Sequence, residues 1–399
     1  MLIQFSVENF RSFKGKAILS LIPSKDTNHE SNLSEITLSE RVLNSIAIYG
    51  ANAAGKTNLF KALTSAILLI RLSNQRQKND ILPGITPFIF DENMKEKPTC
   101  FEFVFETGGV KYIYGFSANQ VEILDEYLYA YFSSKPSTIF ERSGNEYKFP
   151  RDKRMLDQIA EKNTPNKLFL STATAWNYER TEAPNNWFAT GINTYPDYEQ
   201  MQNTSLELYE EEDKQKIHDF TLELLRESDI NIDDYHIKDA KVMDAKKHNI
   251  FMDHLVTRED GSTGKITLNL NDESRGTGNI FMLAPILRRA LKNGETVVID
   301  EIERSLHPLL VKNIIAYFND AERNPNHAQL IFNTHNLELM SLDIFRRDQI
   351  YFVDKSIKTG ESELYSLDEF SVRTEENIRK GYLLGRYGAL PSILEGLSR

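Results

Sequence analysis

The segment from Gly50 to Thr57 is the first whose residue types and spacing could do chemistry. It reads Gly50-Ala51-Asn52-Ala53-Ala54-Gly55-Lys56-Thr57 and fits the pattern G-x-x-x-x-G-K-[ST]. Glycines allow such a loop to turn its N–H groups onto phosphates, the lysine adds positive charge, and the threonine hydroxyl binds Mg²⁺. By chance the pattern occurs in roughly one or two chains in a hundred of this length. Here a strand precedes it and a helix follows, so we expect a loop that, with Asn58, binds the phosphates of ATP.

Two adjacent acids form the second pattern. Asp300 and Glu301 directly follow Thr296-Val297-Val298-Ile299, which is typical of a buried strand. A carboxylate at the end of such a strand beside a phosphate loop can hold the water shell of Mg²⁺, and a second can polarise the attacking water. The alternative is a core strand that ends in solvated acids. With the loop upstream, the sequence favours Asp300 as metal ligand and Glu301 as general base.

Elsewhere the same chemistry is indicated by weaker patterns. Ser274, Gly276 and Thr277 lie at the expected start of a helix, where N–H groups can meet a phosphate, although Ser274 could equally be a simple N-cap. His335 follows a short apolar run and would lie near the phosphates if that run is a strand beside Asp300. Arg11 is either close to the nucleotide or an ordinary surface arginine.

An α/β fold must bring these segments together. Alternation predicts an edge hairpin in residues 2–22, strands within 99–131, 249–257 and 264–270, and a surface loop over 23–40. A helix is expected from 205 to 226. The C-terminal part alternates helix and strand, with strands at 296–299, 329–332 and 349–353 and helices near 278 and 309–318. The predicted division is 1–90 and 263–399 as two halves of one P-loop head, with an α+β insertion over 91–262.

Composition narrows the classes of protein. The 399 residues carry a net charge of −11 and one cysteine, which excludes an internal disulfide and a surface that is basic all over. Apolar stretches are too short to span a bilayer, and no secretion signal is apparent. These observations favour a cytoplasmic protein with no membrane partner.

In their order along the chain, the motifs resemble the ABC-type ATPase heads of SMC, RecF and OLD proteins, and most closely the small bacterial ABC-type ATPases of abortive infection and phage defence. Residues 7–13, Val-Glu-Asn-Phe-Arg-Ser-Phe, are similar to the opening strand of those heads. Residues 300–308 resemble the OLD-type Walker B motif with its D-loop, and Asn333-Thr334-His335 resembles the switch histidine. The implied fold is an ABC-type head: a mixed sheet with an N-terminal antiparallel part.

Specific roles follow from the resemblance. Ser274, Gly276 and Thr277 match the signature motif that completes the partner subunit's ATP site, although Arg275 stands where the usual motif has glycine. His335 matches the residue that senses the γ-phosphate. Gln75 and Gln77 match no motif, so the Q-loop is not located. The resemblance implies Mg²⁺ and ATP as cofactors.

It also implies partners: an ATP-sandwiched homodimer or higher oligomer, and a separate effector such as a nuclease or toxin. The alternative is a RecF- or SMC-like ATPase that binds DNA in repair or maintenance. A scaffold with negligible turnover is disfavoured because Glu301 is present.

Overall fold

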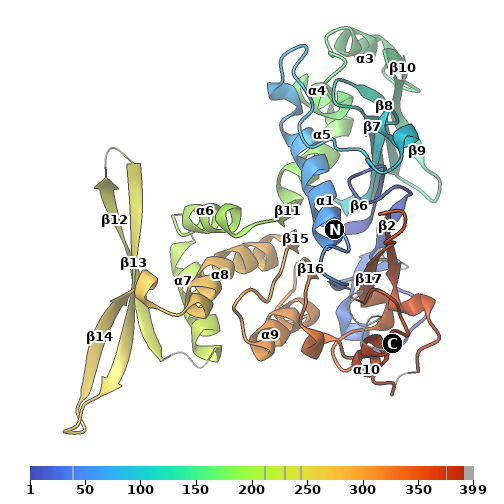
Figure 1. The fold of residues 1–399 in the computed structure, drawn as a ribbon. Helices are drawn as coiled ribbons and strands as arrows, with labels where there is room; N and C mark the ends of the chain where they lie inside the picture. Colours follow the sequence, from blue (N-terminus) through green and yellow to red (C-terminus); the bar gives the residue numbers. More distant parts are fainter. Residues whose placement is uncertain (38–39, 211–212, 229–230, 243–244, 374, 391–399) are drawn as a thin grey trace.

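The α/β fold with mixed sheets is confirmed. The computed structural model describes residues 1–37, 40–210, 213–228, 231–242, 245–373 and 375–390. Strands within these ranges form a seven-stranded sheet, a six-stranded sheet, a three-stranded sheet and a two-stranded pair (Figure 1). None of the helices in these ranges is both long and apolar enough to cross a membrane.

The first sheet is antiparallel and includes the N-terminus. Its order is β10-β9-β8-β7-β6-β1-β2. Residues 2–22 do form a hairpin, but only β2 is an edge strand, because β1 also pairs with β6, with Phe5 opposite Phe103. The strands are β1 (Leu2–Glu8), β2 (Ala17–Ser20), β6 (Thr99–Thr107), β7 (Val110–Ala118), β8 (Ile123–Tyr131), β9 (Ser137–Ser143) and β10 (Glu146–Lys148).

The second sheet is the core of the molecule. Its order is β11-β15-β16-β5-β17-β18, and all pairs are parallel except the last. The strands are β5 (Ser45–Tyr49), β11 (Ile192–Tyr195), β15 (Thr296–Ile299), β16 (Gln329–Asn333), β17 (Ile350–Lys355) and β18 (Ser362–Ser366). Since the carboxyl ends of parallel strands meet at one edge, the segments after β5, β11, β15 and β16 converge there.

Both faces of β5 are buried, which explains its unbroken apolar run. Ile46 and Ile48 pack into one core with the first sheet and α1. Ala47 and Tyr49 face a second core, with α8 and α9. The helices are α1 (Lys56–Arg71), α2 (Glu92–Lys95), α3 (Lys153–Ala160), α4 (Phe169–Ala175), α5 (Glu179–Asn186), α6 (Tyr198–Leu208), α7 (Lys214–Glu227), α8 (Arg275–Asn293), α9 (Pro308–Asn319) and α10 (Ile378–Leu383).

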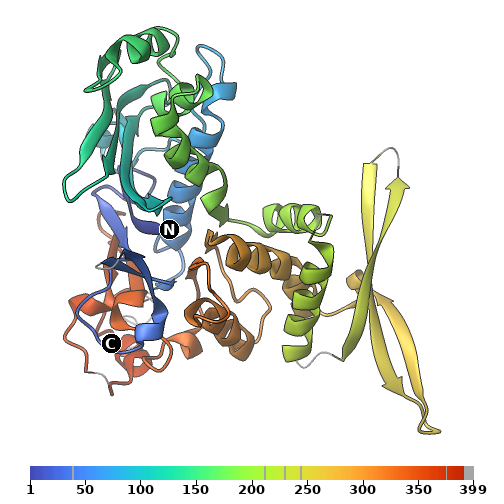
Figure 2. The same ribbon diagram turned by 180° about the vertical axis from the view of Figure 1, so that it is seen from behind.

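A three-stranded sheet extends from the body on the side of α6, α7 and α8 (Figure 2). It contains β12 (Ile232–Val242), β13 (Ala245–Thr257) and β14 (Thr263–Asn269). A continuous helix over residues 205–226 was a wrong prediction: α6 ends at Leu208 and α7 begins at Lys214. Residues 211 and 212 between them lie outside the described ranges.

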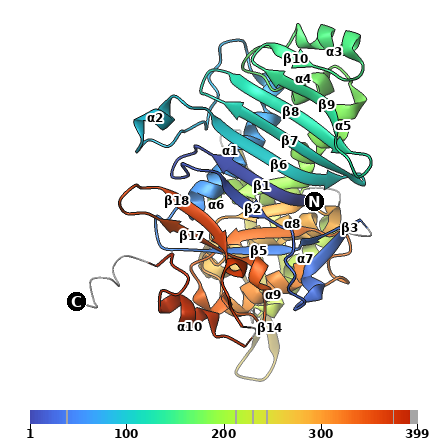
Figure 3. The same ribbon diagram turned by 90° about the vertical axis from the view of Figure 1, so that its right-hand side faces the viewer.

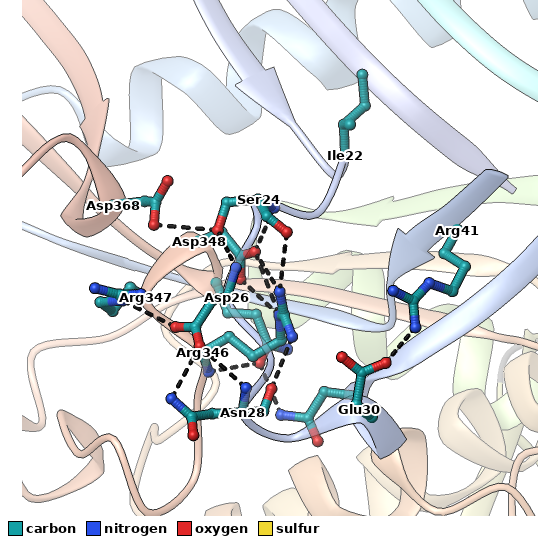
Figure 4. A network of polar contacts seen from close by, with 12 residues as sticks. Ile22, Ser24, Asp26, Asn28, Glu30, Arg41, Arg346, Arg347, Asp348 and Asp368 are labelled. Carbon is teal, nitrogen blue, oxygen red and sulfur yellow. Dashed lines mark hydrogen bonds and ion pairs between the residues drawn. The ribbon is translucent and has the colours of Figure 1, made fainter. Parts of the chain in front are cut away.

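The prediction of a surface loop over residues 23–40 was also wrong in part, because its first half is docked on the C-terminal part. In Figure 3, β1 and β2 lie beside β17 and β18. Below them the fully buried Arg346 donates to Asp348, Nε to Oδ1 at 3.0 Å, and to the Asn28 carbonyl at 2.7 Å (Figure 4).

Arg347 Nε lies 2.9 Å from Asp26 Oδ2. Burial alone would raise the pKa of Asp26, but hydrogen bonds from Asn28 and Arg347 hold this pKa below its ordinary value. Residues 38 and 39 of this loop lie outside the described ranges. Beyond Asp26, β3 (Leu33–Thr37) pairs with β4 (Glu40–Leu43).

Candidate nucleotide-binding site

The phosphate loop joins β5 to α1, as expected. Gly50 and Gly55 have φ of 151° and 122°, a conformation that favours glycine. A Cβ on Gly50 would lie 2.3 Å from the Val353 carbonyl oxygen, and one on Gly55 would lie 2.6 Å from Ser362 Oγ. The loop therefore has to be glycine at both ends, because β17 and β18 press against it. No side chain caps α1, so its first N–H groups face the loop.

Lys56 begins α1 and is buried. Its Nζ donates to the Gly50 carbonyl at 2.8 Å and to the Ala51 carbonyl at 3.1 Å. Burial lowers the pKa of Lys56, while the negative charges of Asp300, Glu303 and Glu301 oppose the shift. The cation thus faces three carboxylates across the loop.

Asp300 lies at the end of β15, next to α1. Thr57 Oγ1 is 3.5 Å from Asp300 Oδ1, and the Asn333 side-chain amide donates to the same oxygen. Burial raises the pKa of Asp300, and the hydrogen bonds from Asn333 and Thr57 oppose the rise. The pairing of Thr57 with Asp300 is the arrangement predicted for a magnesium site.

Asn333, whose chemistry the sequence prediction missed, connects the two acids. It ends β16 and is only 1% exposed. Its Oδ1 accepts a hydrogen bond from the Glu301 amide at 2.8 Å, while its amide holds Asp300. A polar residue at the end of an otherwise apolar run was the available signal.

Glu301 has a left-handed backbone, with φ of 54°. Such a conformation costs a residue other than glycine about 1 kcal/mol or more and is found at functional sites. Its carboxylate is 46% exposed, and its Oε2 lies 3.7 Å from Arg304 Nη2. The expected base therefore faces solvent, next to the guanidinium of Arg304.

His335 and Glu303 link the turns after β16 and β15. The His335 amide donates to Glu303 Oε1 at 2.6 Å. The side chain of His335 is exposed, two residues beyond Asn333. The backbone of His335 therefore contacts the turn after β15, and its role at the phosphates stays a prediction. Glu303 is a second residue that the sequence prediction missed.

Ser274 is the N-cap of α8. Its Oγ accepts from the Thr277 amide at 3.1 Å and lies 2.9 Å from Thr277 Oγ1. Thr277 is buried, whereas Ser274 and Arg275 are exposed. Among the hydrogen bonds of the described residues, none joins Ser274 to the phosphate loop. Within one subunit the serine therefore organises the first helical turn.

The start of α8 is fixed to the D-loop. A Cβ on Gly276 would lie 3.0 Å from the Ser305 carbonyl oxygen, so any side chain at this position would crowd the turn after β15. Asn279 Nδ2 donates to the Arg304 carbonyl at 2.5 Å. The turn after β15 is thereby in direct contact with the helix that bears Ser274.

Arg11 lies in a tight turn, with φ of 50°, and its amide donates to the Thr86 carbonyl at 2.7 Å. Its guanidinium is 5.7 Å from the Phe10 ring, and its buried Nε has no partner among the described residues. The adjacent Ser12 accepts from Asn58 Nδ2 at 2.8 Å, so this turn touches the start of α1. Arg11 is therefore the neighbour of a residue that contacts the first turn of α1, directly after the phosphate loop. Its contact with a nucleotide stays a prediction.

A cavity of about 240 Å³ adjoins the acids. It is lined by Thr57, Asp300, Glu301, Tyr195, Asp197, Tyr198, Met201, Asn279, Leu283 and Leu306, among others. Its outer wall is the turn between β11 and α6. Since β11 flanks β15, this turn lies next to Asp300. Gln75 belongs to a short helical turn beyond α1, and Gln77 follows that turn.

The residues present fit a nucleoside triphosphate with Mg²⁺. The loop needs glycine at Gly50 and Gly55, Lys56 and the α1 N-terminus supply positive charge, and hydroxyl and carboxylate oxygens of Thr57 and Asp300 are the donors that Mg²⁺ prefers. In the described residues no group of three or more His, Cys, Asp or Glu side chains could hold another metal ion.

This fold and site define a P-loop ATPase of the α/β class. Residues 45–341 match a family described as "AAA domain, putative AbiEii toxin, Type IV TA system". The chain belongs to this family.

Solved structures with a similar fold include the SMC head domain from Thermotoga maritima, with 15% identity, 92% of this chain and 98% of that chain covered, and a TM-score of 0.44. The SMC head of Pyrococcus furiosus with an extended coiled coil, bound to the C-terminal domain of ScpA, has 12% identity, 100% and 99% coverage and a TM-score of 0.42. CbiO1 of Clostridium perfringens, part of an ABC transporter complex, has 11% identity, full coverage of both chains and a TM-score of 0.34. No match was found among curated proteins.

Proposed function

We propose that this protein binds Mg-ATP and hydrolyses it, and that it gates a separate effector in bacterial phage defence. One observation carries the catalytic part: Lys56, Thr57, Asp300 and Glu301 meet at one edge of the core sheet. Bound Mg²⁺ would stabilise the charge of the phosphates. Lys56 would bind the phosphate oxygens, Thr57 and Asp300 would hold the metal, and Glu301 would take the proton of the attacking water.

The exposed start of α8 supports a head-to-tail homodimer sandwiching two ATP molecules, or a higher oligomer that contains it. Ser274 and Arg275 lie at the surface, at a helix N-terminus that suits an anion. In the proposed dimer, Ser274 and Gly276 face the partner's nucleotide, while the buried Thr277 holds the turn. His335, exposed beside Asp300, senses the γ-phosphate.

The family description supports the role in defence, since it names a toxin of a toxin–antitoxin system. The three-stranded sheet supports coupling to a partner. His254 of β13 pairs with Glu273 at 2.7 Å, and Glu273 immediately precedes Ser274. A protein that contacts this sheet would therefore act next to the proposed composite site. We place the protein in the cytoplasm, where ATP is available.

ATP binding and turnover test the proposal directly. Lys56→Ala should abolish nucleotide binding, because the charge on the phosphates is lost. Glu301→Gln should keep binding and lower phosphate release by about 10²–10⁴-fold, since an amide is no base. Calorimetry and a phosphate-release assay measure both, and wild-type turnover by Glu301→Gln would refute the assignment.

Duplex DNA distinguishes the alternative function. A RecF- or SMC-like clamp should bind duplex only with ATP, and its affinity should fall steeply with salt. We expect no such binding, and finding it would favour the repair or maintenance reading over effector gating.

A further inference from the structure

Glu303 is a half-buried carboxylate to which the proposed reaction assigns no role. It lies in the turn after β15, two residues beyond Glu301, and its side chain reaches across to the turn after β16. The bond from the His335 amide to Oε1 is 2.6 Å, a length typical of charge-assisted hydrogen bonds. The two turns have a second link, between the Ile302 amide and the Asn333 carbonyl at 3.4 Å.

The other oxygen of Glu303, Oε2, is buried and has no hydrogen-bond partner among the described residues. A buried carboxylate oxygen without a partner costs free energy, and structures retain such atoms mostly at functional sites. Burial lowers the pKa of Lys56, and the negative charge of Glu303 opposes this shift together with those of Asp300 and Glu301. The carboxylate is therefore part of the phosphate site and not of the general surface.

His335 gains its position from this contact. The Thr334 amide donates to the Ile48 carbonyl in the sheet at 3.1 Å, which fixes the chain up to that residue. Beyond it the exposed His335 is held through its backbone by Glu303. Within the described part of the chain the imidazole makes no hydrogen bond, so the exposed ring can meet a ligand.

We propose that Glu303 is a positioning residue of the ATPase: it tethers the backbone of His335 so that the imidazole stands ready beside Asp300. This deepens the proposed function and rests on it. Glu303 acts through His335 and through the hydrogen bond it accepts. An amide oxygen can accept the same bond, so Glu303→Gln should preserve the tether and Glu303→Ala should remove it.

The first test needs no nucleotide. Hydrogen exchange of the peptide over residues 334–340 should be about ten- to a hundredfold faster in Glu303→Ala and close to wild type in Glu303→Gln. Glu338→Ala removes an exposed acid from the same loop and should leave exchange unchanged. Unchanged exchange in Glu303→Ala would overturn the tether.

The second test uses the full chain with Mg-ATP. Glu303→Ala should lower kcat about 10- to 100-fold with the dissociation constant of ATP unchanged, as expected when a catalytic group is misplaced. In a His335→Ala background, Glu303→Ala should cause no further loss of kcat. If Glu303 had a merely structural role, the losses from the two substitutions would add. If Glu303→Ala fails to fold, Glu303→Gln decides: near-normal kcat supports the tether, and a loss as large as that of His335→Ala overturns it. If the wild-type protein shows no ATP turnover, the proposed function is refuted. The hydrogen-exchange experiment would then still test whether Glu303 holds the His335 backbone.

Discussion

Replacing Asn333 by aspartate should make the stability of this protein depend on pH. One oxygen of the new carboxylate can still accept the hydrogen bond from the Glu301 amide. The other oxygen, however, faces Asp300 at the place where the Asn333 side-chain amide donated. The site is almost fully buried, so two carboxylates there will share a proton at neutral pH. The apparent pKa of the pair should rise by about two units or more.

The sign and size follow from proton linkage. A raised pKa means that the folded state binds more protons than the unfolded chain, so the free energy of unfolding falls as pH rises from the unfolded value near 4 through the raised value. At about 1.4 kcal/mol per unit, the loss between pH 4 and pH 8 should be about 3 kcal/mol beyond that of wild type. Burial already raises the pKa of Asp300, so wild type should show a smaller change of the same sign.

Urea unfolding of the nucleotide-free protein at several pH values measures this difference. Asn333→Ala is the matched control, because it removes both the amide that donates to Asp300 and the oxygen that accepts from the Glu301 amide. It should cost about 2–4 kcal/mol, with little more dependence on pH than wild type shows. Equal pH profiles for the aspartate and alanine variants would refute the reasoning.

Three further outcomes are expected. Gly55→Ala should weaken ATP binding at least about tenfold, since its Cβ would lie 2.6 Å and 2.8 Å from two serine hydroxyls, and a fluorescent nucleotide titration checks it. Asp348→Ala should destabilise the protein by about 3–5 kcal/mol in urea, because Arg346 stays buried without its ion pair; a change below 1 kcal/mol would contradict this. Ser274→Arg should bind ATP but not dimerise with it in light scattering, and mixing it with Lys56→Ala should restore part of the turnover; normal turnover by Ser274→Arg alone would contradict the shared site.

Local patterns predicted the elements that carry the site. Strands at 296–299 and 329–332 correspond to β15 and β16, and the phosphate loop lies between β5 and α1. These predictions succeeded because the buried parallel strands are continuous apolar runs in the sequence. The strand β11 was not predicted, because Ile192-Asn193-Thr194-Tyr195 is short and half polar and becomes a strand only through β15, a hundred residues further on.

Contacts over long separations explain the other differences. Nothing near residues 23–40 indicates that Arg346 and Arg347 hold them, so the sequence predicted a surface loop. Likewise, Glu303 and Asn333 become site residues only when β15 and β16 lie side by side. The three-way division of the chain stays a prediction, although β6 to β10 continue the sheet of β1 and β2.

The strand order has a consequence for how this protein is made. The neighbours of β5 are β16 and β17, so the strand that leads into the phosphate loop is synthesised about 280 to 300 residues before its partners. During translation β5 therefore lies in a chain whose core sheet is still incomplete, and chaperones are expected to shield this apolar strand. A chain that stops before β17 lacks the carbonyl against which Gly50 packs. Nucleotide binding should therefore appear only after the ribosome has passed residue 355, and prematurely terminated products should be inert.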